Sequence, residues 1–198
     1  IINYCINKNA KLIFLSSYVY GNCNLPTNEK SMIKPSNTYS LSKVFAENLI
    51  NYYVNNKELE CIVLRVFNLF GTNQNKKFLI PMIINQVINS KKIVINDISP
   101  SRDFLYIDDF IDLLNTIISK KFHSDVFNVG SGKTYKLTKI IEIIQKEFKT
   151  NLPIINRNLK RNNEVYISQA DISKIRKKYK WSPKISFNIG IRKIKDAI

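Results

Sequence analysis

Cysteine and histidine are scarce in this sequence. Its 198 residues include three cysteines and one histidine, and the cysteines lie far apart, outside any C-x-x-C pair. We therefore predict neither a disulfide framework nor a zinc site. This cysteine usage fits a reducing compartment. We expect a cytoplasmic protein.

Long apolar runs are also missing. No run approaches the ~18 residues that a membrane-spanning helix needs. The start of the chain, IINYCINKNAKLIFLSS, lacks the basic segment, apolar segment and cleavage site of a signal peptide. We therefore expect no association with a membrane.

Acidic residues are few, with 15 Asp and Glu against 31 Lys and Arg and a net charge of +16. Such a charge can attract nucleic acid. The basic residues are spread along the chain, however, and their one dense cluster is KIRKKYK at 174–180. We therefore expect no nucleic-acid partner. A nucleic-acid binder stays an alternative, and its binding would fall steeply with salt.

Apolar runs and helical patterns alternate along the chain, which predicts an α/β fold with a parallel sheet. KLIFLSS (11–17) and ECIVLRVFN (60–68) are nearly continuous apolar runs, typical of strands that are buried on both faces. Between them, residues 38–54 carry apolar side chains at helical spacing. Further helices are expected within 78–90, 137–148 and 171–179 and at the C-terminus, and further strands at 91–97, 126–132 and 152–156. Residues 101–119 are expected to pass from an extended stretch into a helix.

Several charged residues have simple structural interpretations. Asp103, Asp108 and Asp109 could suggest a metal site, but consecutive carboxylates at the start of a helix more often cap it. We therefore predict a cap from Asp108 or Asp109 and no metal. Arg65, beside a buried strand, is expected to form an ion pair. His123 is expected to be a surface residue.

Tyr39 and Lys43 lie four positions apart at the head of the helix expected over 38–54. Residues at this spacing share one helical face, with Cβ atoms about 5–6 Å apart, so a phenol and an ammonium could act on one small molecule. Such pairs also arise by chance on solvated faces. The spacing alone leaves both interpretations open.

Four short stretches, taken together, favour the catalytic interpretation. They are LSSYVYG (15–21), TYSLSK (38–43), LRVFNLFG (64–71) and SRDFLYIDDF (101–110). In this order they resemble the extended short-chain dehydrogenase/reductases, and among these the NAD-dependent epimerases and dehydratases of nucleotide sugars. VFNVGSG (126–132) and RNNEVYISQADISKIRKKYKWSP (161–183) also resemble that family's C-terminal pattern.

The resemblance implies a fold and its division. The fold would be the C-terminal part of an NAD(P)-binding Rossmann fold with an interleaved small α+β substrate-binding lobe. Residues 1–71 would hold later Rossmann strands and helices with the catalytic motif, 72–100 the first part of the lobe, 101–132 a return to the sheet, and 133–198 the rest of the lobe.

A glycine-rich turn that could bind a dinucleotide is missing. The five glycines, at 21, 71, 130, 132 and 190, form no G-x-x-G-x-x-G or G-x-G-x-x-G turn. The resemblance begins just before the strand that carries the catalytic serine or threonine. We therefore expect a fragment that lacks the N-terminal NAD-binding βαβ units.

The resemblance also implies catalytic roles. Tyr39 would be the acid/base, Lys43 would assist it and grip the nicotinamide ribose, and Ser16, or Ser17 if the register differs by one, would hydrogen-bond the reacting sugar oxygen. Ser16, Tyr39 and Lys43 would contact NAD. A free phenol loses its proton only near pH ~10, so a base at neutral pH needs a nearby positive charge. For the serines, capping of the strand end is the alternative.

Four further residues would bind the substrate. Arg102 and Arg161 would hold the diphosphate, for which a planar, permanently charged fork is suited. Asn68 would contact the phosphates or the sugar, and Glu164 stands where many relatives have an aspartate that contacts a ribose. The alternatives are solvated arginines and, for Asn68, turn formation.

The residues after Ser16 bear on the reaction. Sugar 4,6-dehydratases that resemble this family have acidic residues there, whereas this chain has Ser17 and Tyr18. We therefore expect NAD-dependent 4-epimerisation of a UDP-hexose, such as UDP-glucose or UDP-galactose, in surface polysaccharide synthesis, by a homodimer when full length. The alternatives are a nucleotide-sugar 4-keto reductase that uses NADPH and a non-catalytic fragment that binds a nucleotide sugar.

Overall fold

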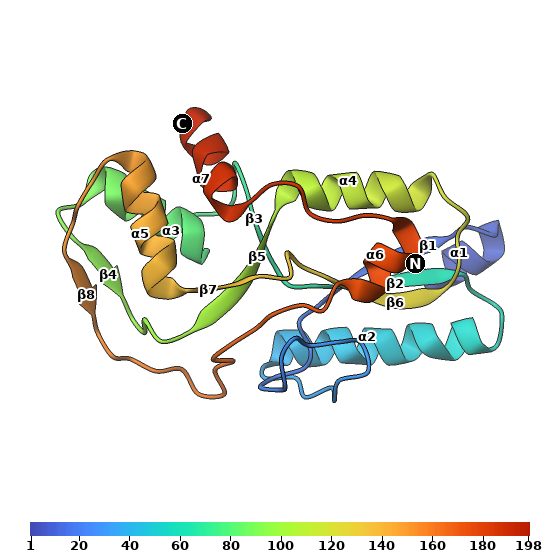
Figure 1. The fold of residues 1–198 in the computed structure, drawn as a ribbon. Helices are drawn as coiled ribbons and strands as arrows, with labels where there is room; N and C mark the ends of the chain where they lie inside the picture. The colour runs from blue at the N-terminus through green and yellow to red at the C-terminus, as the bar shows by residue number, and fades with distance from the viewer.

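A three-stranded parallel sheet lies at one end of the computed structural model, which describes residues 1–198 (Figure 1). Its strands are β1 (Leu12–Ser17), β2 (Cys61–Val66) and β6 (Asp125–Val129), in the order β1-β2-β6. Every residue of β2 is buried, as expected for a central strand with both faces covered. Helices α2 (Thr38–Asn55) and α4 (Ile107–Ile118) lie on opposite sides of this sheet (Figure 1).

A capping box fixes the start of α2. The Asn37 side chain accepts from the backbone N–H of Ser40, and the Ser40 hydroxyl accepts from the N–H of Asn37. These bonds satisfy two groups that the first turn of a helix would otherwise leave unpaired. Tyr39 is therefore held in the first turn, and the helix predicted over 38–54 is confirmed.

The other end of the molecule has its own apolar core. It combines β3 (Asn68–Phe70), β5 (Ser101–Tyr106) and β7 (Thr134–Lys136), the parallel pair β4 (Ile93–Ile95) and β8 (Ile154–Asn156), and the helices α3 (Leu79–Asn89), α5 (Leu137–Phe148) and α7 (Phe187–Asp196). Helices α3 and α5 lie beside β4 and β8 at the left of Figure 1, and α7 contacts α5. Strand β5 leads from this end directly into α4 on the parallel sheet (Figure 1).

The predicted α/β class with parallel strands is confirmed. Three short elements were not predicted: α1 (Ile2–Lys8), β3 and β7. The four-segment division stays a prediction. Helix α6 (Ser173–Tyr179), assigned from the sequence to the substrate lobe, packs on β6, where Lys174 pairs with Asp125 at 2.6 Å.

The predicted cap of α4 is wrong. The N-cap is Tyr106, whose side chain makes no cap bond, because β5 runs into the helix without a loop. The Asp109 carboxylate instead accepts from the backbone N–H groups of Lys184 and Ile185 at 3.0 Å. Asp108 pairs with Lys193. Asp109 therefore fastens the segment that leads into α7, and Asp108 contacts α7 itself.

None of the helices combines the length and the apolar character that a membrane span requires. No group of three or more His, Cys, Asp or Glu side chains is arranged to hold a metal ion. All three cysteines are free, and His123 is exposed.

Candidate active site

Tyr39 and Lys43 stand beside the carboxyl end of β1. Lys43 is half-buried, and its Nζ donates to the backbone oxygen of Leu15 at 2.9 Å. The same Nζ lies 5.5 Å from the centre of the Tyr39 ring. Tyr39 is 62% exposed, so its phenol is accessible to a ligand. The phenol and the ammonium thus face one region at the end of the sheet.

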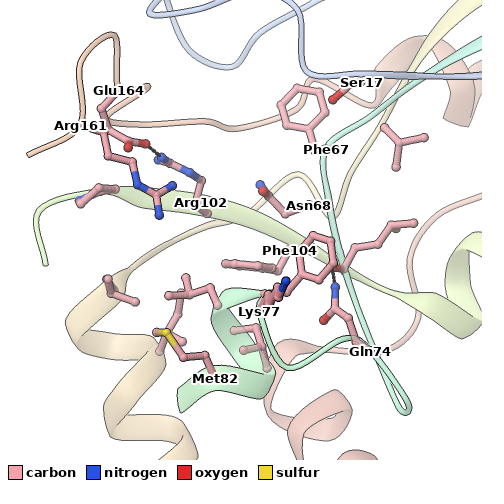
Figure 2. A pocket seen from close by; sticks show the side chains of 18 of the residues that line it. Ser17, Phe67, Asn68, Gln74, Lys77, Met82, Arg102, Phe104, Arg161 and Glu164 are labelled. Atoms are coloured by element: carbon pink, nitrogen blue, oxygen red, sulfur yellow. Dashed lines mark hydrogen bonds and ion pairs between the residues drawn. The ribbon is translucent and has the colours of Figure 1, made fainter. Parts of the chain in front are cut away.

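The two serines at the end of β1 point differently. Ser16 is buried, and its hydroxyl donates to Oε1 of Glu47 at 2.5 Å. Ser17 is half-buried and carries its hydroxyl beside Phe67 (Figure 2). This difference follows from the alternation of side chains along a strand.

Arg65 forms the predicted ion pair. Its Nη2 lies 2.6 Å and its Nε 3.0 Å from Oε2 of the buried Glu47. Its Nη1 donates to the Tyr20 hydroxyl at 2.9 Å. Burial alone would lower the pKa of Arg65, but the bonds to Glu47 and Tyr20 raise it on balance. Sequence reasoning did not single out Glu47.

One cavity brings the predicted site residues together. It has a volume of about 1070 Å³, and its lining includes all of Ser16, Ser17, Tyr39, Lys43, Asn68, Arg102, Arg161 and Glu164. Apolar side chains such as Met82 line another part (Figure 2), and Phe78 also belongs to the lining. Ligand sites commonly reach about 1,000 Å³, so this one can accept a ligand larger than a single sugar.

An ion pair stands at the wall of this cavity. Arg102 Nη2 pairs with the carboxylate of Glu164, and its Nη1 donates to the backbone oxygen of Ser101 at 2.9 Å. Burial lowers the pKa of Arg102, while the charge of Glu164 opposes this shift. Arg161 lies beside the pair (Figure 2) and makes no ion pair or hydrogen bond within the chain. Its guanidinium is therefore free to bind an anion.

Asp103 organises the backbone behind Arg102. Its buried carboxylate accepts from the N–H groups of Ser131, Gly132 and Ala170 and from the Ser131 hydroxyl. Burial raises the pKa of Asp103. A Cβ on Gly130 would stand 2.9 Å from its Oδ2, so the close approach requires a glycine. From the sequence we considered Asp103 only as a possible metal ligand, and we did not predict its hydrogen bonds to the backbone.

The family of the chain follows from its match to known proteins. Residues 1–194 match the family model described as GDP-mannose 4,6 dehydratase. The chain belongs to this family. The predicted resemblance to NAD-dependent epimerases and dehydratases is thereby confirmed. Relatives of the chain include nucleotide-sugar epimerases, dehydratases and reductases, so family membership leaves the reaction open.

Three similar proteins illustrate this range. The dTDP-4-dehydro-6-deoxyglucose reductase of Escherichia coli is 31% identical over 99% of this chain and 66% of its own length. The UDP-glucuronic acid 4-epimerase of Bacillus cereus, solved with UDP-glucuronic acid and NAD, is 25% identical with a TM-score of 0.90, over 100% of this chain and 65% of that one. RMD of Pseudomonas aeruginosa, solved with NADPH, is 26% identical with a TM-score of 0.87. The match covers 94% of this chain and 66% of that one. The chain spans just under two thirds of each of these family members.

The donor groups present suit part of a nicotinamide cofactor. A lysine ammonium has three N–H donors. Lys43 donates one of them to the backbone oxygen of Leu15, so two can donate to ribose hydroxyls. The accessible Tyr39 hydroxyl lies on the same side. These side chains therefore fit the nicotinamide ribose end. The sequence contains no glycine turn for the pyrophosphate.

A smaller, polar recess adjoins the cavity. Its volume is about 400 Å³, and it shares Asn68, Arg102, Arg161 and Glu164 with the larger cavity. Tyr18 also lines it, with its hydroxyl donating to the backbone oxygen of Gly21 at 2.5 Å. Burial, followed by the contact with Cys23, raises the pKa of Tyr18. Tyr18 therefore stays protonated.

Proposed function

We propose that the protein catalyses NAD-dependent 4-epimerisation of a nucleotide sugar, a UDP-hexose such as UDP-glucose or UDP-galactose. One observation carries the proposal. A single cavity joins Tyr39 and Lys43 to the arginines Arg102 and Arg161. An acid/base pair and a diphosphate site in one cavity suit a substrate that carries a sugar on a diphosphate.

The cavity offers a place for each part of that substrate. Arg102 and Arg161 would bind the diphosphate, because guanidinium groups match its oxygens in shape and charge. Asn68, held by a bond from its Nδ2 to the backbone oxygen of Asp103, would contact the sugar or the phosphates. The apolar part near Phe78 and Met82 would cover the base. Glu164, the ion-pair partner of Arg102, would accept a hydrogen bond from a ribose hydroxyl.

Tyr39 would carry out the proton transfer. When bound, NAD supplies the reversible hydride acceptor that the reaction needs. The Tyr39 phenolate would take the proton of the C4 hydroxyl and later return it. The Lys43 ammonium, 5.5 Å from the ring centre, would stabilise the phenolate, and Ser16, which lines the cavity, would hydrogen-bond the sugar oxygen.

Dehydration is disfavoured by the residues after Ser16. Elimination of water needs an acid and a base next to C5 and C6. Ser17 is a neutral hydroxyl, and Tyr18 is bonded to Gly21 with a raised pKa. Neither side chain is suited to act as the acid or the base of this elimination.

A 4-keto reductase is the second candidate, favoured by the similarity to the Escherichia coli reductase. It would use the same Tyr39 and Lys43, with Tyr39 giving its proton to the substrate oxygen. The two reactions differ in stoichiometry. An epimerase regenerates its cofactor in each turnover, whereas a reductase consumes one NADPH for each product.

The test uses the native gene product that carries these residues. It is incubated with UDP-galactose and trace NAD, and separately with a 4-keto nucleotide sugar and NADPH, with the products resolved by chromatography. We expect UDP-glucose in the first reaction and none with Tyr39→Phe. NADPH consumption in the second reaction alone would favour the reductase. Failure of both reactions would overturn the proposal.

A further inference from the structure

A loop of the chain, residues 160–166, helps to orient Arg102. The Nη2 of Arg102 pairs with the carboxylate of Glu164 in this loop (Figure 2), and its Nη1 donates to the backbone oxygen of Tyr166 at 3.3 Å. The same Nη1 also donates to the backbone oxygen of Ser101. A guanidinium has five N–H donors, so two are left for the oxygens of a diphosphate. The direction in which these two donors point therefore depends on the 160–166 loop.

The 160–166 loop has no anchor in an apolar core, because none of its residues is buried. Backbone hydrogen bonds hold the chain at its two ends. The N–H of Leu159 donates to the oxygen of Asn96 at 2.7 Å, and the N–H of Ser101 donates to the oxygen of Tyr166 at 2.7 Å. Segments with few buried apolar contacts move easily. Between its two ends, the loop therefore depends on the side chains that bind it from outside.

Besides Arg102, the side chain that binds the 160–166 loop is Asn22. Its Nδ2 donates to the backbone oxygen of Glu164 at 3.0 Å, and its Oδ1 accepts from the backbone N–H of Tyr166 at 3.0 Å. A side-chain amide has a donor and an acceptor next to each other, so one residue can bind the backbone on both sides of Val165. These partners lie 142 and 144 positions from Asn22, so no local motif indicates the contact.

The backbone before Asn22 is itself held in place. Gly21 has a φ of +67°, and a Cβ there would stand 2.7 Å from the backbone oxygen of Lys34. The Tyr18 hydroxyl donates to the Gly21 oxygen at 2.5 Å, and the Tyr18 ring packs edge-on against Phe67 with centroids 5.0 Å apart. Phe67 directly follows β2. Asn22 thus connects the 160–166 loop to the end of the parallel sheet.

We propose that Asn22 is a positioning residue, which holds the 160–166 loop in place and thereby orients Arg102 toward the diphosphate of the substrate. The inference deepens the proposed function and rests on it. Phosphate oxygens compete with Glu164 for the guanidinium of Arg102. Where they displace Glu164, the two bonds from Asn22 keep the Tyr166 oxygen against Arg102. Loss of Asn22 should therefore weaken binding of a diphosphate.

The test measures the dissociation constant of UDP in the native gene product by calorimetry. We expect Asn22→Ala to raise it about tenfold, because two hydrogen bonds to the loop are lost. Asn24 is exposed in the same segment and does not contact the loop, so Asn24→Ala should change the constant less than about twofold. If Asn22→Ala does not fold, Asn22→Asp removes the donor alone, and Asn24→Asp adds the same charge as its control. Asn22→Asp should then bind UDP more weakly than Asn24→Asp.

A double variant distinguishes positioning of Arg102 from a general structural role. In the Arg102→Gln background, Asn22→Ala should weaken UDP binding by less than about twofold, since the group that it positions is gone. A tenfold loss that persists there, or UDP binding by Asn22→Ala equal to that of Asn24→Ala, would overturn the inference and leave the proposed function standing. If the unmodified protein does not bind UDP, the proposed function fails, and this inference fails with it.

Discussion

Lys43 is tied to Leu15 by a hydrogen bond of 2.9 Å from its Nζ to the backbone oxygen. The bond joins the helix of Tyr39 to the strand of Ser16, two elements that lie far apart in the sequence. The ammonium therefore has a fixed place beside the phenol ring. We expect this placement to matter for turnover more than for folding.

Lys43→Met tests that expectation. The variant keeps the apolar stem but removes the charge that would stabilise a Tyr39 phenolate and the donors for a ribose. Turnover should fall by about 10²-fold or more, with weaker binding of NAD. Steady-state kinetics and equilibrium dialysis with NAD measure the two effects. Lys57→Met, on the exposed segment after α2, is the matched control, and an equal loss there would contradict the account.

Arg102→Gln should weaken binding of the nucleotide sugar. The side chain lines both the cavity and its polar recess, and a charge-assisted bond to a diphosphate contributes about 1.5–3 kcal/mol. The dissociation constant of UDP should therefore rise about 10–100-fold in calorimetry. Arg157 is exposed and does not line the cavity, so Arg157→Gln should bind UDP normally. Equal weakening in the two variants would refute a specific diphosphate site.

Asp103→Asn should destabilise the fold. The carboxylate accepts four hydrogen bonds, three of them from backbone N–H groups, and an amide can satisfy only some of them. We expect a loss of about 3 kcal/mol in the free energy of unfolding, measured in urea. Asp112 forms an exposed ion pair with Lys184, so Asp112→Asn should change stability by less than about 1 kcal/mol. Similar losses in the two variants would contradict the role assigned to Asp103.

Alkaline pH should destabilise the protein through groups that are buried with their protons. Burial raises the pKa of Cys61 to about 12 and that of Tyr20 to about 12. The folded state therefore holds these protons more tightly than the unfolded state. Their contribution is complete below pH ~9 and is lost as the pH rises toward ~12.

Cys61→Ala isolates one of these protons. The free energy of unfolding of this variant should fall less steeply with pH between pH 9 and 10.5 than that of the unmodified protein. The two slopes should differ by at most about 1.4 kcal/mol per pH unit. Urea unfolding over this range measures both slopes. Parallel curves for the variant and the unmodified protein would show that the thiol does not contribute.

The exposed face of α2 bears on assembly, for which we propose a homodimer. Leu41, Phe45 and Leu49 recur at intervals of four and are each between 38% and 64% exposed. An apolar stripe of this kind favours contact with another surface. Phe45→Glu should therefore shift the native gene product from dimer to monomer in sedimentation velocity. A monomer before substitution, or a dimer after it, would contradict the proposal.

Local patterns predicted much of the fold. The apolar runs of β1 and β2 and the helical spacing of α2 and α5 depend on neighbouring residues, and all four elements formed where expected. The strands β3 and β7 have three residues each, too few for a periodic signal. Their pairing with β5 comes from the tertiary fold.

The sequence indicated some residues of the candidate site and missed others, because some contacts join residues that are distant in the sequence. Tyr39 and Lys43 were predicted because the stretches around them, in their order along the chain, resemble those of a known family, whereas their spacing alone left their role open. Glu47 was missed because its partners Ser16 and Arg65 lie 31 and 18 positions away in the sequence. Only the pairing of β1 with β2 brings them to one carboxylate. A spacing of four beyond Lys43 was the one local signal that could have indicated it.

The most direct test of the account is the rate of UDP-galactose conversion by Tyr39→Phe in the native gene product. We predict that turnover falls by about 10²–10⁴-fold, because the phenol that moves the proton is gone. Binding of the nucleotide sugar should stay within about twofold, since the contacts proposed for its diphosphate are Arg102 and Arg161, which line the same cavity. Conversion at the unmodified rate would contradict the assignment of Tyr39 as the acid/base.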